Sequence, residues 1–320
     1  MRGARDIFRF LLEAGTRGER TALVTLVGLS GSASRARGSH MAVSETGASI
    51  GSLSGGCVEA AVVAEAQRII AAGRAECVRF GAGSRYMDIR LPCGGSIDLM
   101  FTPEPPVAFV REAMGLLDAR QQVRLLIEAG GSLAIQRSMS AAKAGAFVAV
   151  HEPDLRLVLV GHGAEPQALA RQARAFGAAV KVLTPNEDSV HALRAEGFDT
   201  VHLSSASRTP HLDADQHTAI VFLFHDHDWE AALLEQALEQ DAFFIGAMGS
   251  RRTHAQRCAL LTERGIAAAD IARIVGPIGL IEAARDPEML AISTLAQVAG
   301  RYHALYRDSL VVDAEPAFVF

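Results

Sequence analysis

One stretch decides the fold class: LRLVLVGHGAEP, at residues 155–166. A continuous apolar run, a glycine turn and the start of a helix follow one another there, as in a parallel strand that passes into a helix. Further apolar runs stand at 180–183 and 219–224, with helical patterns between them. This alternation of strands and helices predicts a Rossmann-like domain built on a parallel sheet.

The composition changes at His151-Glu152-Pro153-Asp154, which we interpret as a linker. We therefore expect two domains, 1–150 and 151–320, and an α/β protein as a whole. For the first domain the pattern predicts a mixed α+β fold. One helix is expected at 4–15, a second begins at residue 58, and a third ends at about residue 120. Its expected strands are 21–28, 39–44, 48–53, 76–80, 96–101, 122–128, 131–136 and 145–151.

The bulk composition is that of an ordinary soluble protein, with 49% hydrophobic and 21% charged residues among 320. A net charge of −5 argues against binding to nucleic acid or to an anionic membrane. No apolar run approaches the ~20 residues that span a bilayer. Four cysteines are too few for a disulfide scaffold, so we expect a reducing, cytoplasmic location.

Two cysteines stand beside glycine pairs in mirror-image order. The two elements are Gly55, Gly56, Cys57 and Cys93, Gly94, Gly95. Glycine pairs let another group approach the backbone closely, so both thiols predict a soft-ligand or reactive-thiol site. Cys57 also opens a helical run, and the positive end of the helix dipole favours its thiolate. Cys77 and Cys258 lie in regular patterns and are expected to be packed thiols.

A loop of small residues at 30–38 carries Ser32 and Arg35. Its hydroxyl and guanidinium groups suit an anion. The alternative is a mobile surface loop, which the neighbouring glycine–cysteine element makes less attractive.

Gly161 and Gly163 match the first two glycines of the dinucleotide fingerprint, but Pro166 stands where the third would fall. The segment Thr184-Pro185-Asn186 offers no acid for a ribose. The turn therefore predicts a phosphate- or nucleotide-binding site rather than an ordinary NAD site, with a purely structural turn as the alternative.

Polar residues follow two further strands of this domain. His225 and Asp226 end the apolar run at 219–224, where open parallel sheets bind ligands. These residues predict a polar site, with helix capping or metal ligation as alternatives. Gly249, Ser250 and Arg251 open a helix whose amides and guanidinium suit a phosphate, unless the arginine is simply solvated.

Together these motifs resemble the XdhC/CoxI family, accessory factors of xanthine dehydrogenase-type molybdoenzymes. Two places depart from the family pattern, Ile281 and the pair Ala296-Gln297. The matching elements cover nearly the whole chain in collinear order. They are Gly31–Met41, Gly51–Glu59, Leu91–Gly95, Gly161–Gly163, His225–Asp226, Gly246–Arg252 and Pro277–Leu280.

The resemblance implies a chaperone without turnover of its own, which holds the molybdenum cofactor, as molybdopterin or its cytosine dinucleotide form, during sulfuration. It then inserts the cofactor into a xanthine dehydrogenase or aldehyde oxidoreductase type apo-molybdoenzyme. Cys57 and Cys93 become candidate molybdenum contacts. A cysteine desulfurase and a cytidylyltransferase are the other expected partners, and a homodimer the expected assembly.

Two alternatives stay open on the sequence. One is an NAD(P)-dependent oxidoreductase, suggested by the Rossmann-like half. The other is a docking factor that recruits a cysteine desulfurase without holding any cofactor.

Overall fold

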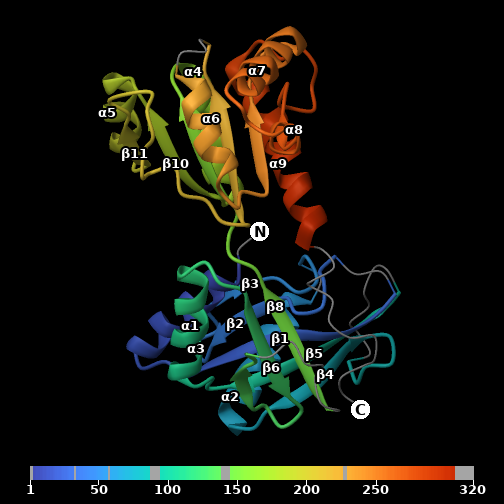
Figure 1. Ribbon diagram of the computed structural model, residues 1–320. Coiled ribbons are helices and arrows are strands. Elements are labelled where there is room, and N and C mark those ends of the chain that lie inside the picture. Colours follow the sequence, from blue (N-terminus) through green and yellow to red (C-terminus); the bar gives the residue numbers. More distant parts are fainter. Residues whose placement is uncertain are drawn as a thin grey trace. The chain divides into compact units, whose positions relative to one another are not determined.

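The computed structural model describes residues 3–31, 34–56, 58–86, 94–137, 145–225 and 229–306. Within them the chain forms two compact units, which we call the N-terminal unit (within residues 3–153) and the C-terminal unit (Asp154–Leu305) (Figure 1). Each unit has sheets and hydrophobic cores of its own.

The N-terminal unit is built on a five-stranded antiparallel sheet with its longest strand in the middle. Across the sheet the strands are β3 (Ser49–Gly51), β2 (His40–Ser44), β1 (Thr21–Ser30), β5 (Ser96–Pro103) and β4 (Glu76–Gly81). The first eight residues of β1 are buried, because both faces of the sheet are covered.

One face of this sheet packs against α2 (Glu59–Ala72), whose Val62 and Ile69 join Val24 in one core. On the other face, Leu23 of β1 packs with α1 (Ala4–Thr16) and α3 (Val107–Asp118). A second, three-stranded antiparallel sheet completes this core. Its strands, in spatial order, are β7 (Leu133–Ile135), β6 (Val123–Glu128) and β8 (Ala146–His151).

The C-terminal unit is a six-stranded parallel sheet covered by helices on both faces. Across the sheet the strands are β11 (Asp199–His202), β10 (Ala179–Thr184), β9 (Arg156–Gly161), β12 (Thr218–Leu223), β13 (Phe244–Ala247) and β14 (Ile274–Val275). Numbered from β9, this is the order 3-2-1-4-5-6 of a doubly wound sheet, whose strand order reverses between β9 and β12. The predicted α/β class and Rossmann-like sheet are confirmed.

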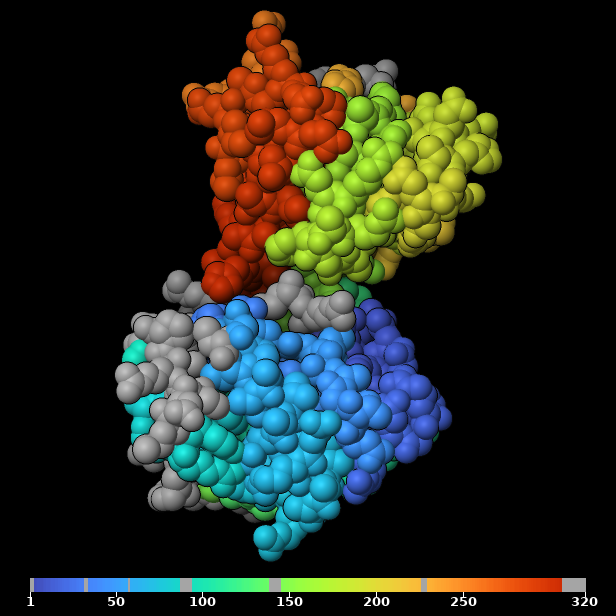
Figure 2. Space-filling view, turned by 180° about the vertical axis from the view of Figure 1, so that it is seen from behind, coloured from blue at the N-terminus to red at the C-terminus, as the bar shows by residue number. Residues whose placement is uncertain are grey.

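Successive residues of β9 feed two cores, because side chains alternate along a strand. Leu157 and Leu159 pack with α4 (Ala164–Phe176), α5 (Glu187–Ala195) and α9 (Pro287–Tyr306). Figure 2 shows this face, with α4 in light green beside α9 in red, where Gln172 donates a hydrogen bond to the carboxylate of Glu288.

The other face of the parallel sheet is covered by three helices that pack against Val158 and Val160. They are α6 (Glu230–Leu238), α7 (Arg251–Glu263) and α8 (Ala268–Ile271). Among the helices of the described residues, none is both long and apolar enough to cross a membrane.

Candidate functional site

The glycine pairs of the N-terminal unit both adjoin the turn after β1. A Cβ added to Gly31 would lie 3.2 Å from the α-carbon of Gly95, and one added to Gly95 would collide with the carbonyl oxygen of Ser30. A Cβ added to Gly55 would lie 3.2 Å from the hydroxyl of Ser34. Gly56 follows on the surface, and Gly94 is also exposed. The fold therefore brings Gly95 and Gly55, one glycine from each mirrored element, next to the loop at 30–38.

Three of the residues predicted there lie outside the described residues: Ser32, Cys57 and Cys93. Arg35 is described and is half-buried. Its Nη1 donates to the carbonyl oxygen of Ser34 at 3.2 Å, while its Nε is buried without a hydrogen-bond partner in the described part of the chain. A buried guanidinium nitrogen in this state calls for an acceptor, which an anionic ligand would supply.

A carboxylate that the sequence prediction did not use holds the loop before α2. Glu59, the first residue of α2, accepts hydrogen bonds from two hydroxyls and a row of backbone amides, at 2.7–3.2 Å. The donors are the hydroxyls of Ser52 and Ser54 and the amides of Leu53, Ser54, Gly55, Gly56 and Val58. Such a concave row of amides is an anion-binding nest, and here the anion is part of the chain.

The nest keeps Glu59 ionised and changes the electrostatics of this loop. Burial alone would raise the pKa of Glu59, but hydrogen bonds from Ser54 and Ser52 outweigh it and lower the pKa to about 2. The negative charge stands at the end of α2 where the sequence prediction counted only the positive helix dipole. The favoured thiolate of Cys57 stays a prediction, but the dipole no longer supports it alone.

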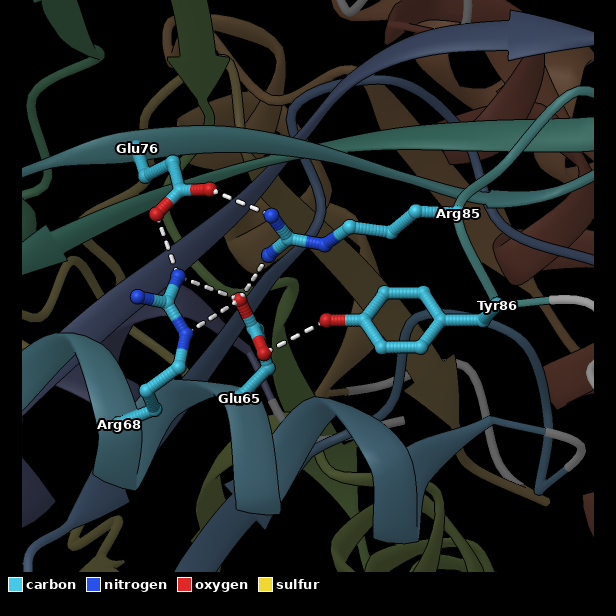
Figure 3. Close-up of polar contacts among 5 residues, drawn as sticks. All are labelled: Glu65, Arg68, Glu76, Arg85 and Tyr86. Carbon is cyan, nitrogen blue, oxygen red and sulfur yellow. Dashed lines mark hydrogen bonds and ion pairs between the residues drawn. The ribbon is translucent and has the colours of Figure 1, made fainter.

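A network of charged side chains anchors the segment that leads into residues 87–93 (Figure 3). Its centre is Glu65, buried on α2, which accepts hydrogen bonds from Arg68 at 2.6 Å, Arg85 at 2.5 Å and the hydroxyl of Tyr86 at 2.6 Å. Glu76 of β4 closes the network by pairing with both arginines. The network therefore holds Arg85 and Tyr86, the last described residues before 87–93, against α2.

Helical periodicity could have revealed this network. Glu65 stands three residues after Val62 and four before Ile69, on the apolar face of α2. An acid at such a position requires a partner, because an unpaired buried carboxylate is costly. Burial raises the pKa of Glu65, but hydrogen bonds from Arg68 and Tyr86 lower it overall.

His40, which is buried, and His151, which is half-buried, form a pair that no sequence pattern indicated. The Nε2 atoms of His40 and His151 are 2.8 Å apart, and the hydroxyl of Thr25 lies 2.9 Å from Nδ1 of His40. The ring of Phe8 lies beside both imidazoles. Burial lowers the pKa of His151 to about 4 and that of His40 well below its ordinary value, to which neighbouring His151 contributes. Both rings are therefore neutral at pH 7.

The C-terminal unit has its candidate site at the reversal of strand order between β9 and β12. A Cβ added to Gly161 would lie 2.7 Å from the carbonyl carbon of Leu223, so glycine is required where these strands approach each other. Gly163 caps α4 with φ +98°, a conformation that favours glycine. Gly161 thus has a packing reason of its own, beside any role toward a ligand.

A carboxylate and two imidazoles surround this turn. Glu165 Oε1 accepts a hydrogen bond from His225 Nε2 at 3.1 Å, and the glutamate side chain is only 15% exposed. The ring of His162 lies between 5 and 7 Å from the rings of Phe224 and His225. Its Nδ1 is buried and has no hydrogen-bond partner among the residues described. Asp226 falls outside them.

The turn after β13 has a simpler local explanation. The side chain of Ser250 caps α7 by accepting a hydrogen bond from the amide of Thr253 at 3.1 Å. Arg251 pairs with Glu282 at 2.8 Å on the open surface, where an ion pair contributes little to stability. Gly249 precedes the cap with a positive φ. The arginine is exposed to solvent, and the turn is a complete helix cap.

A buried ion pair lies next to the turn after β13. Arg257 of α7 donates two hydrogen bonds to Glu230 of α6, at 3.0 and 2.9 Å, and both side chains are 3% exposed. Its Nη2 also donates to the carbonyl oxygen of Met248 at 2.7 Å. The sequence prediction missed the pair, because its members stand 27 residues apart on different helices.

The described residues hold two free cysteines and no metal-binding group. No three or more His, Cys, Asp or Glu side chains converge within the described ranges to hold a metal ion. Burial raises the pKa of the Cys77 thiol to about 12, which fits the packed thiol that the sequence predicted. Cys258 lies 3.7 Å from Nε2 of His254.

The end of β10 is the place where NAD-binding enzymes carry an acid that binds the ribose. In the C-terminal unit the residues there cap a helix. Asn186 follows β10, and its side chain accepts a hydrogen bond from the amide of Ser189 at 2.7 Å. It therefore caps α5. Glu187, the first acid in this corner, is exposed in the first turn of that helix.

Two family models match the chain, one in each half. Residues 157–298 match the XdhC Rossmann domain, and residues 14–81 match the XdhC and CoxI family. A crystal structure described as a xanthine dehydrogenase from Bacillus halodurans has the same fold, with a TM-score of 0.77 over 93% of this chain and 96% of that one. At 19% identity this likeness concerns the fold alone.

Two proteins of Escherichia coli (strain K12) are similar in sequence. The molybdenum cofactor insertion chaperone PaoD is 35% identical over 298 residues, which are 92% of this chain and 87% of PaoD. The uncharacterized protein YqeB is 30% identical over 154 residues, which are 48% of this chain and 28% of YqeB. The resemblance seen in the sequence motifs is confirmed: the chain belongs to the XdhC and CoxI family.

Proposed function

We propose that this protein is a molybdenum cofactor insertion chaperone. The observation that carries the proposal is its 35% identity, over 92% of the chain, to a relative named for that function. The cofactor is the cargo, which the protein holds and delivers without turnover of its own. In the finer form of the proposal, the protein protects the cofactor while a sulfido ligand is installed.

The residues of both candidate sites fit such a cargo. Molybdenum accepts sulfur ligands, so the thiols of Cys57 and Cys93 are the proposed contacts of the metal or its sulfido group. Two buried nitrogen atoms without partners in the described chain, Nε of Arg35 and Nδ1 of His162, stand ready for polar atoms of a ligand. Arg251 offers an accessible guanidinium for an anionic group.

The remaining proposed contacts are the other residues that the sequence predicted for the cofactor. They are Gly55, Gly56, Gly94, Gly95, Gly161, Gly163 and Gly249, together with Ser32, Ser250, His225 and Asp226.

The proposed partners follow from the route of the cargo. The receiving protein is an apo-molybdoenzyme of the xanthine dehydrogenase family, with the aldehyde oxidoreductase kind and its cytosine dinucleotide cofactor as the narrower proposal. A cysteine desulfurase would supply the sulfur and a cytidylyltransferase the dinucleotide. A homodimer in the cytoplasm remains the proposed form of the chaperone.

The test is to isolate the protein from cells that make the cofactor and to measure bound molybdenum and pterin. Transfer to an apo-molybdoenzyme is then followed by its gain of activity. We expect retention of both components by the unmodified protein, and weaker retention in Cys57→Ala and Cys93→Ala, by about tenfold for a lost ligand contact.

Cys77→Ala is the matched control, because that thiol is packed in the same unit and has a raised pKa. Unchanged molybdenum content and transfer in both glycine-flanked variants would contradict the thiol contacts. A protein isolated with neither molybdenum nor pterin would contradict the carrier function and favour a docking factor.

A further inference from the structure

The turn after β9 differs from a phosphate-binding turn in the position of one side chain. Glu165 folds back over the turn, so that its Oε2 is 2.9 Å from where a Cβ of Gly163 would stand. Its Oε1 is fixed by His225. The carboxylate therefore lies at the switch point of the sheet, the place where a dinucleotide fold binds its pyrophosphate.

A phosphate would bind weakly at the turn after β9. The carboxylate of Glu165 adds a negative charge where a phosphate-binding turn offers only backbone amides and the positive end of a helix dipole. Pro166, in the first turn of α4, has no amide hydrogen and removes one donor from that end. The amides of Ala164 and Glu165 remain donors, but the Glu165 carboxylate adds two acceptor oxygens at the turn, which suit a ligand that carries hydrogen-bond donors.

We propose that Glu165 receives the aminopyrimidine edge of a pterin at this turn. This edge carries two adjacent N–H donors, the ring N3–H and the 2-amino group, which match the two acceptor oxygens of one carboxylate. The buried Nδ1 of His162 stands beside the same turn without a partner in the described chain. The inference rests on the proposed function, because the molybdenum cofactor is what supplies the pterin.

The assignment leaves the anionic end of the cargo to another turn. β12 lies between β9 and β13, and all three strands are parallel. Their carboxyl ends therefore share one edge, with the turns after β9 and β13 about 10 Å apart at ordinary strand spacing. A ligand with donors at one end and a phosphate at the other would reach from Glu165 toward Ser250 and Arg251.

The experiment titrates the full chain at pH 7 with free pterin and with lumazine, followed by their own fluorescence. Lumazine is the same ring system with a carbonyl in place of the 2-amino group, so it offers Glu165 an acceptor where pterin offers a donor. We expect pterin to bind at least about tenfold more tightly than lumazine, as for one hydrogen bond to a charged acceptor. Glu165→Gln should abolish this preference.

Glu187→Gln is the matched control, since Glu187 is also in the first turn of a helix in this sheet but is exposed. It should keep the preference for pterin, and circular dichroism should show both variants folded. Equal binding of pterin and lumazine, binding of neither, or an undiminished preference in Glu165→Gln would overturn the proposal. Displacement of pterin by inorganic pyrophosphate would also overturn it.

These outcomes are separate from those of the proposed function. A protein that carries molybdenum and pterin but shows no Glu165-dependent preference would overturn this site alone. A protein that shows the preference, but carries no cofactor when isolated, would support the site and contradict the carrier function.

Discussion

At the scale of single residues, the paired imidazoles of His40 and His151 make the N-terminal unit sensitive to acid. Their Nε2 atoms share one proton in a 2.8 Å hydrogen bond, so one ring donates and the other accepts. A second proton would remove the acceptor and place a charge beside Phe8. Burial therefore opposes protonation of either ring.

The sign of the pH dependence follows from the lowered pKa values. Above pH 6.5 the histidines are neutral in the folded and the unfolded chain, and their contribution to stability is complete. As the pH falls from 6.5 toward 4, the histidines bind protons in the unfolded chain but not in the folded chain. The free energy of unfolding therefore decreases. With a folded pKa of about 4 for His151, the loss at pH 5 is about 2 kcal/mol.

We therefore expect the free energy of unfolding of the N-terminal unit to fall by at least about 2 kcal/mol between pH 7 and pH 5, the part that His151 alone contributes. Hydrogen-exchange mass spectrometry on peptides from β1 and β2 would measure it. His151→Gln, which keeps a polar group but does not titrate, should reduce the slope, whereas the exposed control His191→Gln should not. An identical slope in His151→Gln would show that the pair is not the titrating group.

At the scale of elements, the start of α2 depends on one side chain that belongs to the helix itself. The predicted strand over 48–53 stops at Gly51 in the structure, because the amides of Leu53 and Ser54 donate to Glu59 and not to a neighbouring strand. The loop and the helix are thus one folded piece. The network around Glu65 adds the segment 84–86 to the same helix.

Glu59→Gln is expected to destabilise the N-terminal unit by about 2–3 kcal/mol, because an amide nitrogen would face amide donors in place of one carboxylate oxygen. Urea denaturation followed by circular dichroism measures this loss. The control is Glu13→Gln on the exposed side of α1, which should change stability by no more than about 0.5 kcal/mol. Equal stability of the two variants would mean that the nest contributes nothing to folding.

At the scale of the whole molecule, each unit buries its own hydrophobic residues. The core clusters built on β1 and β5 draw only on the N-terminal unit, and those built on β9 and β12 only on the C-terminal unit. The single tryptophan, Trp229, packs against a core of the C-terminal unit. Its fluorescence therefore reports on one unit, while circular dichroism reports on both.

We expect Phe101→Ala, at a fully buried position of β5, to cost the N-terminal unit about 3–5 kcal/mol. In a thermal melt, part of the circular dichroism signal should then be lost at a lower temperature, while the transition seen by Trp229 fluorescence stays in place. A matching shift of both signals would show that the units unfold together.

The sequence predicted the C-terminal sheet well, because a strand buried on both faces has a largely continuous apolar sequence, such as that of residues 155–160. The short edge strands β11 and β14 were not predicted, since four and two residues carry too little pattern. The helix after β9 begins at Ala164, two residues before Pro166, because proline is tolerated in a first turn.

The candidate sites were predicted less completely than the fold. The motifs singled out loops that adjoin in the fold, where Gly31 lies against Gly95 and Gly55 lies beside Ser34. They did not reveal that Glu59 fills its own loop or that Glu165 meets His225, 60 residues away. Side-chain pairing across such separations depends on the packed sheet, and no local spacing encodes it.

The nest around Glu59 has a consequence for competition among anions. Because the carboxylate is joined to the loop by the backbone, its effective concentration at these amides far exceeds that of any free anion in a cell. With a pKa of about 2, no physiological acidity releases it. The carboxylate of Glu59 therefore keeps the loop amides occupied, and free phosphate competes poorly for them. Only a ligand that is also bound at other points of the protein could displace it.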